Sequence, residues 1–267
     1  MSLPGAIAGR RVERLEPVAG GDLNDAYAAQ LEGGGRAFVK TRDGAAPGEY
    51  AAEAAGLAWL GEGGALVPAV LEATDGFLAL EWLERETVDA AGQEELGRRL
   101  ATMHRAGAER FGATPHDGPL RLGPLTLPND PAETWPRFYA ERRLRPLAER
   151  AGLTAEVERV CDRLPQLAGP PEPPARLHGD LWSGNVLGRH LIDPAAYGGH
   201  REVDLAMLQL FGSPSPRTLV AYDEVWPRAD GHEERVALYQ LFPLLVHAVL
   251  FGGGYVASAR AAARRYA

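Results

Sequence analysis

The stretch that decides the fold is HGDLWSGN at residues 178–185, which is followed by IDP at residues 192–194. Asp180 and Asn185 lie in the first motif, and Asp193 lies in the second. The segment between the motifs is apolar at both ends, and Gly188 can provide a turn. This pattern predicts a tight hairpin that brings Asn185 and Asp193 together at its open end.

The three polar side chains of these motifs have the residue types that phosphoryl transfer requires. The reaction needs a carboxylate that accepts the proton of the attacking hydroxyl, and oxygen ligands for the magnesium ion that neutralises the triphosphate. We predict that Asp180 is the catalytic base and that Asn185 and Asp193 bind Mg2+. Protein kinases use a similar arrangement. The alternative is that Asp180 and Asn185 only cap turns. The His-Gly before Asp180 and the Ile-Asp-Pro after Asn185 disfavour it.

A second candidate is Lys40, which ends the apolar strand Ala37–Lys40. A lysine at this point can reach the α- and β-phosphates of a nucleotide if a glutamate from the next helix holds it. Glu53 is the predicted partner, and Glu49 is the alternative. Taken alone, a lysine at a strand end is more often a solvated charge.

Two loops are candidates for further nucleotide contacts. Gly20 and Gly21 would allow backbone N–H groups to approach phosphate, although a plain hairpin turn explains them almost as well. Glu81 and Leu83 close the last strand of the N-terminal part, and we expect their backbone to bind the adenine edge. The chain lacks the GxxxxGK[ST] pattern, which excludes a P-loop kinase.

Other residues are expected to support these groups or to face the substrate. We predict that Asp204 and His178 support the catalytic loop, with the Asp204 carboxylate bracing its backbone N–H groups; the alternative for Asp204 is a charge that complements a helix dipole. Trp182 is expected to face the acceptor pocket and to stack on a sugar, or else to pack the loop. His104 and His247 are interpreted as core histidines, with a substrate contact as the alternative for each.

The pattern of elements predicts an α+β, two-lobed, protein-kinase-like fold. Residues 1–83 form a small antiparallel β-rich lobe with one helix, in the order strand, strand, strand, helix, strand, strand, and residues 84–267 form a larger helical lobe. Pro243 is expected to kink the last long helix. The expected strands are 10–18, 26–31, 37–40, 70–73 and 77–82, and the expected helices are 48–60, 88–108, 131–151, 154–164, 203–211, 216–226 and 232–251.

Composition limits the function classes. The net charge of −8 over 267 residues disfavours nucleic acid as a partner. The single cysteine, Cys161, cannot form an intrachain disulfide. The N-terminus lacks the pattern of a secretory signal, and the apolar stretch 241–256 is too short for a membrane span. We therefore expect a cytoplasmic protein without membrane or nucleic-acid partners.

The same motifs resemble the fructosamine kinase (ketosamine-3-kinase) family, and the resemblance covers almost the whole chain. The aminoglycoside phosphotransferases and choline kinases of the same superfamily would explain only the HGD…N…D core. The most specific similarities are HGDLWSGN at 178–185, DPAAY at 193–197, REVDLAM at 201–207 and LFGGGY at 250–255.

The resemblance implies ATP-dependent phosphorylation of a sugar hydroxyl on a free or protein-bound ketosamine, and a role in deglycation. It also implies that Asp180 is the base, that Asn185 and Asp193 hold Mg2+, that Lys40 with Glu53 positions the phosphates, and that Trp182 lines the sugar site. Two alternatives stay open: a kinase for another small hydroxyl compound, such as an aminoglycoside or choline, and an inactive nucleotide-binding module. The sugar, the amine and the oligomeric state are left undetermined.

The chain departs from the family pattern in three places. The segment between Asn185 and Asp193 is shorter than usual, Pro243 replaces a helix-compatible residue, and the phosphate loop lacks the cysteine that some relatives use for a redox-sensitive disulfide. That regulation is therefore not carried over to this chain, and redox regulation is left undetermined.

Overall fold

The N-terminal part of the chain forms an antiparallel sheet with one helix against it. The computed structural model describes residues 3–18, 24–212 and 214–267. The sheet has the strand order β1-β2-β3-β4-β6-β5, and every neighbouring pair is antiparallel. Its elements are β1 (Ala6–Ile7), β2 (Arg10–Val18), β3 (Asp25–Leu31), β4 (Arg36–Thr41), α1 (Glu49–Glu62), β5 (Val70–Ala73) and β6 (Leu78–Glu81).

The local sequence explains this part well. Gly33, Gly34 and Gly35 all have positive φ, between 77° and 94°, which lets the chain turn between β3 and β4 without a Cβ clash. Helix α1 buries Tyr50 and Leu57 against Leu78 and Leu80 of β6. The predicted order of three strands, a helix and two strands is confirmed, and β1 is an additional short strand.

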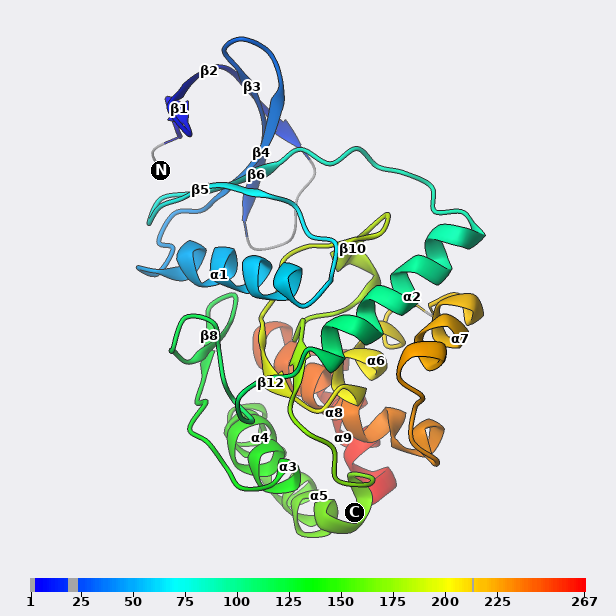
Figure 1. Ribbon diagram of the computed structural model, residues 1–267. Coiled ribbons are helices and arrows are strands. Elements are labelled where there is room, and N and C mark those ends of the chain that lie inside the picture. Colours follow the sequence, from blue (N-terminus) through cyan, green and yellow to red (C-terminus); the bar gives the residue numbers. More distant parts are fainter. Residues whose placement is uncertain (1–2, 19–23, 213) are drawn as a thin grey trace.

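The remaining chain forms a larger, mainly helical part below the sheet (Figure 1). The α+β fold with a β-rich N-terminal part is thus confirmed, and the boundary between residues 83 and 84 stays a prediction. Its helices are α2 (Ala90–Arg105), α3 (Trp135–Phe138), a π-helical turn (Tyr139–Leu144), α4 (Arg145–Ala151), α5 (Thr154–Leu167), α6 (Glu202–Leu208), α7 (Pro216–Val225), α8 (His232–Phe251) and α9 (Gly254–Tyr266).

Short strand pairs connect these helices. The pairs are β7 (Leu120–Leu122) with β8 (Leu125–Leu127), β9 (Ala175–Leu177) with β12 (Tyr197–Gly199), and β10 (Val186–Leu187) with β11 (His190–Leu191). Of these, only the β10–β11 hairpin was expected. The helix predicted over residues 131–151 is instead three helical segments, of which the first begins at Trp135, and α9 was not predicted.

Helix α8 is the central helix of this part. By length and composition alone it could span a membrane, contrary to the shorter apolar stretch expected from the sequence. More than half of it is buried, however, and it packs against α4, α6 and α9, as a core helix does. Pro243 lies inside α8, which runs without interruption to Phe251, so the expected kink stays a prediction.

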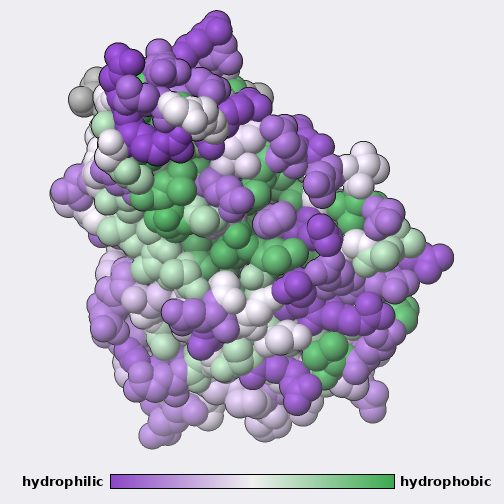
Figure 2. Space-filling model, turned by 45° about the horizontal axis from the view of Figure 1, so that its top comes forward, coloured by the Kyte–Doolittle hydropathy of each residue, from purple (hydrophilic) through white to green (hydrophobic). Residues whose placement is uncertain are grey.

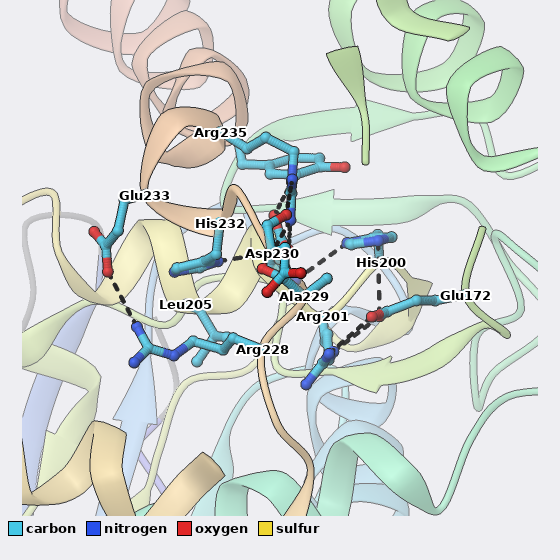
Figure 3. Close-up of polar contacts among 12 residues, drawn as sticks. Glu172, His200, Arg201, Leu205, Arg228, Ala229, Asp230, His232, Glu233 and Arg235 are labelled. Atoms are coloured by element: carbon cyan, nitrogen blue, oxygen red, sulfur yellow. Dashed lines mark hydrogen bonds and ion pairs between the residues drawn. The ribbon is translucent and has the colours of Figure 1, made fainter. Parts of the chain in front are cut away.

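Buried ion pairs tie α6 to α8 and to the segment before β9 (Figure 3). Arg235 of α8 donates to both carboxylate oxygens of Glu202, at 2.8 and 2.6 Å. Arg201 donates to both oxygens of Glu172, at 2.8 and 2.7 Å. Because α6 carries Asp204, this network also positions a carboxylate that contacts the loop at residues 178–185.

Candidate active site

The loop at residues 178–185 follows β9, and two of its glycines are required by close packing. A Cβ at Gly179 would lie 2.0 Å from the carbonyl oxygen of Ala195, and its φ is +81°. A Cβ at Gly184 would lie 2.2 Å from the ring of Trp182. Glycine at these positions therefore lets the loop lie against the segment that follows Asp193 and lets the tryptophan ring fold over the loop.

Asp180 is the carboxylate at the centre of this loop. The Asn185 amide nitrogen donates to the Asp180 carbonyl oxygen at 2.8 Å and to its Oδ2 at 3.1 Å. Burial, together with repulsion from Asp193, raises the pKa of Asp180 to about 6. A carboxyl group whose pKa is near neutral, and whose side chain is held by an amide, is suited to proton transfer.

The β10–β11 hairpin brings Asn185 and Asp193 together. Val186 pairs with Leu191, Gly188 provides the turn with φ +65°, and the N–H of Ile192 donates to the Asn185 carbonyl at 3.0 Å. The two candidate metal ligands therefore flank the open end of the hairpin. Asp193 has a φ of 54°, a left-handed conformation that is uncommon outside glycine and that clusters at functional sites.

Lys40 joins the two parts of the molecule at this point. Its Nζ lies 2.8 Å from Oε2 of Glu53 on α1 and 3.0 Å from Oδ1 of Asp193. Burial opposes the charge of Lys40, but the attraction of these carboxylates outweighs it and raises the pKa of Lys40 above its usual range. The alternative partner, Glu49, instead pairs with Arg42 at 2.5 Å.

A second layer of hydrogen bonds holds the loop from behind. The Asp204 carboxylate accepts from the backbone N–H groups of His178 at 2.7 Å and Gly179 at 2.9 Å, and it lies 3.2 Å from Nε2 of His104. His178 Nε2 donates to the carbonyl of Ile192 at 2.9 Å. Burial lowers the pKa of His178, which keeps it neutral in this role. His104 is fully buried and also bonds to Tyr222, as expected for a core histidine.

One cleft of about 540 Å³ lies between the two parts of the molecule, in front of this second layer. Apolar surface crosses the middle of the molecule, below the hydrophilic tip of the sheet (Figure 2). The predicted site residues that line the cleft are Lys40, Glu53, Asp180, Trp182, Asn185 and Asp193.

The structure does not bring every predicted residue to this cleft. Glu81 and Leu83 are not among the described residues that line it, and the backbone N–H of Glu81 donates to the carbonyl of Ala69 at 2.8 Å. Gly20 and Gly21 lie outside the described residues. Their proposed nucleotide contacts therefore stay predictions.

The far end of the cleft holds aromatic residues that the sequence did not assign to the site. His247 lines the cleft and is only partly buried, so its interpretation as a core histidine was wrong. Phe211, Phe251 and Tyr255 line the cleft beside it. The FGGGY segment contains Phe251 and Tyr255, but no role was assigned to it. His247, Phe251 and Tyr255 come together only around the turn from α8 to α9, and the sequence alone does not show that they meet.

Comparison with known proteins gives a consistent result. The model of a family described as fructosamine kinase matches residues 6–266. A protein of Thermus thermophilus named as a probable ketoamine kinase is 37% identical over 249 residues, which cover 90% of this chain and 89% of that protein. A crystal structure from Thermobifida fusca, described as a candidate fructosamine-3-kinase, is 45% identical with a TM-score of 0.90 and covers 97% of this chain and 95% of its own.

A more distant structure shares the fold alone. The macrolide 2'-phosphotransferase of Brachybacterium faecium is 18% identical, with a TM-score of 0.62, and the alignment covers 97% of this chain and 94% of that one. The arrangement of a small sheet above a helical part is thus common to phosphotransferases that act on different acceptors.

Proposed function

Because the chain belongs to the fructosamine kinase family, we propose that it transfers the γ-phosphate of ATP to a sugar hydroxyl of a ketosamine, the adduct of a sugar with an amine. The observation that carries this proposal is the convergence of Asp180, Asn185, Asp193 and Lys40 in one cleft. Lys40 lies far from the other three residues in the sequence, and folding places all four where a triphosphate and an acceptor hydroxyl can meet.

Each residue has a distinct role in the proposed reaction. Asp180 accepts the proton of the sugar hydroxyl as its oxygen attacks the γ-phosphorus, and the bond from phosphorus to the bridging oxygen of ADP breaks. Lys40, held by Glu53, binds the α- and β-phosphates. Asn185 keeps the Asp180 carboxylate oriented, and Asp204 with His178 keeps the loop in place. Trp182, whose ring is 38% exposed in the cleft, stacks on the sugar.

The donor set at the hairpin fits Mg2+. Asn185 uses its amide nitrogen to bind Asp180, which leaves its Oδ1 without a hydrogen-bond partner in the described part of the chain. Asp193 provides a carboxylate beside it, and amide and carboxylate oxygens are the ligands that magnesium prefers. When bound, the ion would neutralise charge that develops on the phosphates. Asn185 and Asp193 would hold it together with phosphate oxygens.

The adenine and phosphate contacts complete the proposed nucleotide site. The backbone of Glu81 and Leu83 would bind the adenine edge, and the backbone N–H groups of Gly20 and Gly21 would approach the phosphates. The acceptor could be free or bound to a protein, and phosphorylation would destabilise the adduct, which gives a role in deglycation. The expected compartment is the cytoplasm, whose reducing environment fits a chain with a single cysteine, Cys161.

The lining of the cleft argues against polycationic acceptors such as aminoglycosides. Four carboxylates occur among the described residues that line it, and three of them are already paired with cations: Glu49 with Arg42, and Glu53 and Asp193 with Lys40. Only Asp180 is left for an incoming ammonium group, and the proposed mechanism uses it for the hydroxyl. A substrate with several ammonium groups would therefore have to compete with Lys40 and Arg42 for these carboxylates.

A panel of acceptors tests the proposal. We expect ATP-dependent phosphate transfer to fructose- and ribulose-type ketosamines and little transfer to aminoglycosides or choline. The release of ADP measures turnover, and phosphorus NMR of the product identifies the phosphorylated hydroxyl. Robust turnover of choline or an aminoglycoside, with none of any ketosamine, would contradict it.

The role of Asp180 has its own test. We expect Asp180→Asn to lower kcat by about a hundredfold or more, the scale of losing a positioned general base, while the KM for ATP changes little. Asp162→Asn on α5, an exposed position outside the cleft, is the matched control and should retain wild-type activity. An Asp180→Asn variant with wild-type turnover would show that another group accepts the proton.

A further inference from the structure

The cleft ends in a cluster of aromatic rings beside the acceptor side of the site. Trp182 lies 6.1 Å from Phe211, measured between ring centroids, and Phe211 lies 5.0 Å from His247. His247 in turn lies 4.9 Å from Tyr255 and 5.6 Å from Phe251. We call these five residues the aromatic wall. All of them line the cleft that contains Asp180.

The rings are arranged as the sides of a corner and not as a flat stack. The planes of Trp182 and Phe211 meet at 84°, and those of Phe211 and Tyr255 meet at 81°. Phe251 is 48% exposed and Trp182 is 38% exposed, although large aromatic side chains usually gain from burial. Exposed ring faces that point in several directions around a hollow are suited to surround a ligand.

His247 has a defined orientation within this wall. Its Nδ1 lies 2.8 Å from the carbonyl oxygen of Pro243. A carbonyl can only accept, so Nδ1 must carry the proton, and in the neutral ring the lone pair is then on Nε2. The wall therefore combines apolar ring faces with a hydrogen-bond acceptor at Nε2 of His247.

The charge of the neighbouring surface indicates which ligand group fits. Val246 and Leu250 continue the wall with apolar side chains, and no carboxylate of the described lining residues lies on the segments that form it, 246–255 and Phe211. Ring faces attract cations through their quadrupole, most strongly where water is excluded. A cation can therefore bind here without a carboxylate partner.

We propose that the aromatic wall binds the secondary ammonium group of the ketosamine, with Nε2 of His247 accepting one of its N–H groups. This inference rests on the proposed function, and it adds which part of the acceptor gives selectivity. In a ketosamine the amine is attached to C1, next to the ketone carbon C2, so the ammonium lies only a few bonds from the sugar hydroxyls. Trp182 connects the two positions, since it follows Asp180 in the loop and contacts Phe211 in the wall.

The test compares a matched pair of ligands. The first is an N-alkyl 1-amino-1-deoxyketose, which is cationic at neutral pH, and the second is the 1-O-alkyl ketose of the same shape, which is neutral. Dissociation constants are measured by calorimetry with the full chain and without ATP, so binding is read whether or not phosphate is transferred. We expect the cationic ligand to bind the wild type about tenfold more tightly.

Substitutions in the wall should change only that preference. Phe251→Leu keeps an apolar side chain but removes the ring face, and we expect it to weaken binding of the cationic ligand about fivefold and to leave the neutral ligand unaffected. Phe251→Trp should retain the preference, since tryptophan offers the strongest ring face. His247→Leu should weaken binding of the cationic ligand by more than Phe251→Leu does. Val220→Ala on α7, at a position that is 62% exposed, is the control and should bind both ligands like the wild type.

The outcomes separate this inference from the proposed function. Equal affinity of the wild type for the two ligands, or equal losses for both ligands in Phe251→Leu, would overturn the role of the wall. Failure of phosphate transfer to every ketosamine would overturn the proposed activity. In that case the affinities for the two ligands would still test whether the aromatic wall binds the ammonium group.

Discussion

At the scale of single residues, His200 is a buried titratable group that lies outside the cleft. Its ring is 2% exposed and stacks on Tyr239 at 5.3 Å with an interplanar angle of 13°. Its Nε2 lies 3.7 Å from Oε2 of Glu172, as Figure 3 shows. Burial lowers the pKa of His200 to about 4 although Glu172 and Glu202 act in the opposite direction. The ring is therefore neutral in the folded protein at neutral pH.

This buried histidine predicts a loss of stability in mild acid. The pKa of His200 is lower in the folded chain than the ordinary 6.5, so the unfolded chain binds more protons between pH 4 and pH 6.5. The contribution of the neutral His200 to stability is therefore present above pH 6.5 and is lost as the pH falls towards 4. The free energy of unfolding should decrease by about 3 kcal/mol from this group. Urea titrations of the wild type and of His200→Gln at pH 7, 5.5 and 4 should show a difference that shrinks by this amount.

Comparison with the variant is necessary because other buried groups titrate in the same range. Burial raises the pKa of Asp180 to about 6, which has the opposite effect on stability between pH 4 and pH 6. Such groups cancel in the difference between the two proteins. If the two stability curves run parallel from pH 7 to pH 4, His200 is not the group responsible.

The residue scale also shows what the sequence could reveal about the site. Asp180, Asn185 and Asp193 belong to one local loop and hairpin, so their spacing alone predicted that they would meet. Lys40 and Glu53 were predicted because Lys40 ends a strand and Glu53 lies on the helix that follows this strand in the sequence. His247 was misinterpreted, since its place on a long apolar helix looks the same in a sequence whether the residue faces the core or a cleft.

At the scale of elements, the π-helical turn at residues 139–144 holds a buried cation without a carboxylate. Arg143 is fully buried, and its guanidinium lies 4.3 Å from the ring centroid of Tyr197 and 4.6 Å from that of Phe138. It donates to Oδ1 of Asn129 at 2.6 Å and to the carbonyl of Pro128 at 2.9 Å. Among the described residues no acidic group forms an ion pair with it, so ring faces and carbonyl dipoles hold its charge.

We expect Arg143→Lys to destabilise the protein by about 2–4 kcal/mol. Lysine cannot make the planar, forked set of hydrogen bonds, nor stack flat between rings, and its more strongly hydrated ammonium costs more to bury. The measurement is chemical denaturation at pH 7. Arg142→Lys is the matched control, because the neighbouring Arg142 is partly exposed and its change should cost less than about 1 kcal/mol. Similar losses for both variants would show that the ring contacts of Arg143 contribute little.

The predictability of the elements follows their length and the range of their contacts. Gly33–Gly35 separate β3 from β4, and Asp75-Gly76 separates β5 from β6, so turn signals and short apolar runs predicted the sheet closely. Strands β7, β9 and β12 have three residues each, too few for a periodic pattern, and they form only through pairing across the fold. Helix α9 was missed because Gly252 and Gly253 precede it and Gly254 is its first residue, and such a glycine run is typical of the end of an element.

At the scale of the whole molecule, the contact between Lys40 and Asp193 is the link across the cleft. Lys40 lies on β4 of the sheet, and Asp193 follows β11 of the helical part. Around this single lysine stand three carboxylates, of Glu53, Asp180 and Asp193, and the negative charge of Asp193 contributes to the raised pKa of Asp180. With Glu49 as a fourth carboxylate and Arg121 as a second cation, the described lining residues carry an excess of negative charge, which would repel ATP unless a divalent cation accompanies it.

This imbalance predicts that ATP stabilises the protein only together with Mg2+. A ligand present at about a hundred times its Kd adds roughly 2.7 kcal/mol to the free energy of unfolding, which corresponds to a rise in Tm of about 5 °C or more for a chain of this size. We expect this rise with ATP and Mg2+, and little change with ATP in the presence of EDTA. Asp193→Asn should lose most of the Mg2+-dependent rise, because a metal ligand is gone, and Asp162→Asn should keep it. An equal rise with and without Mg2+ would place the neutralising charge on the protein itself, with Lys40 as the first group to examine, and would remove the metal role from Asn185 and Asp193.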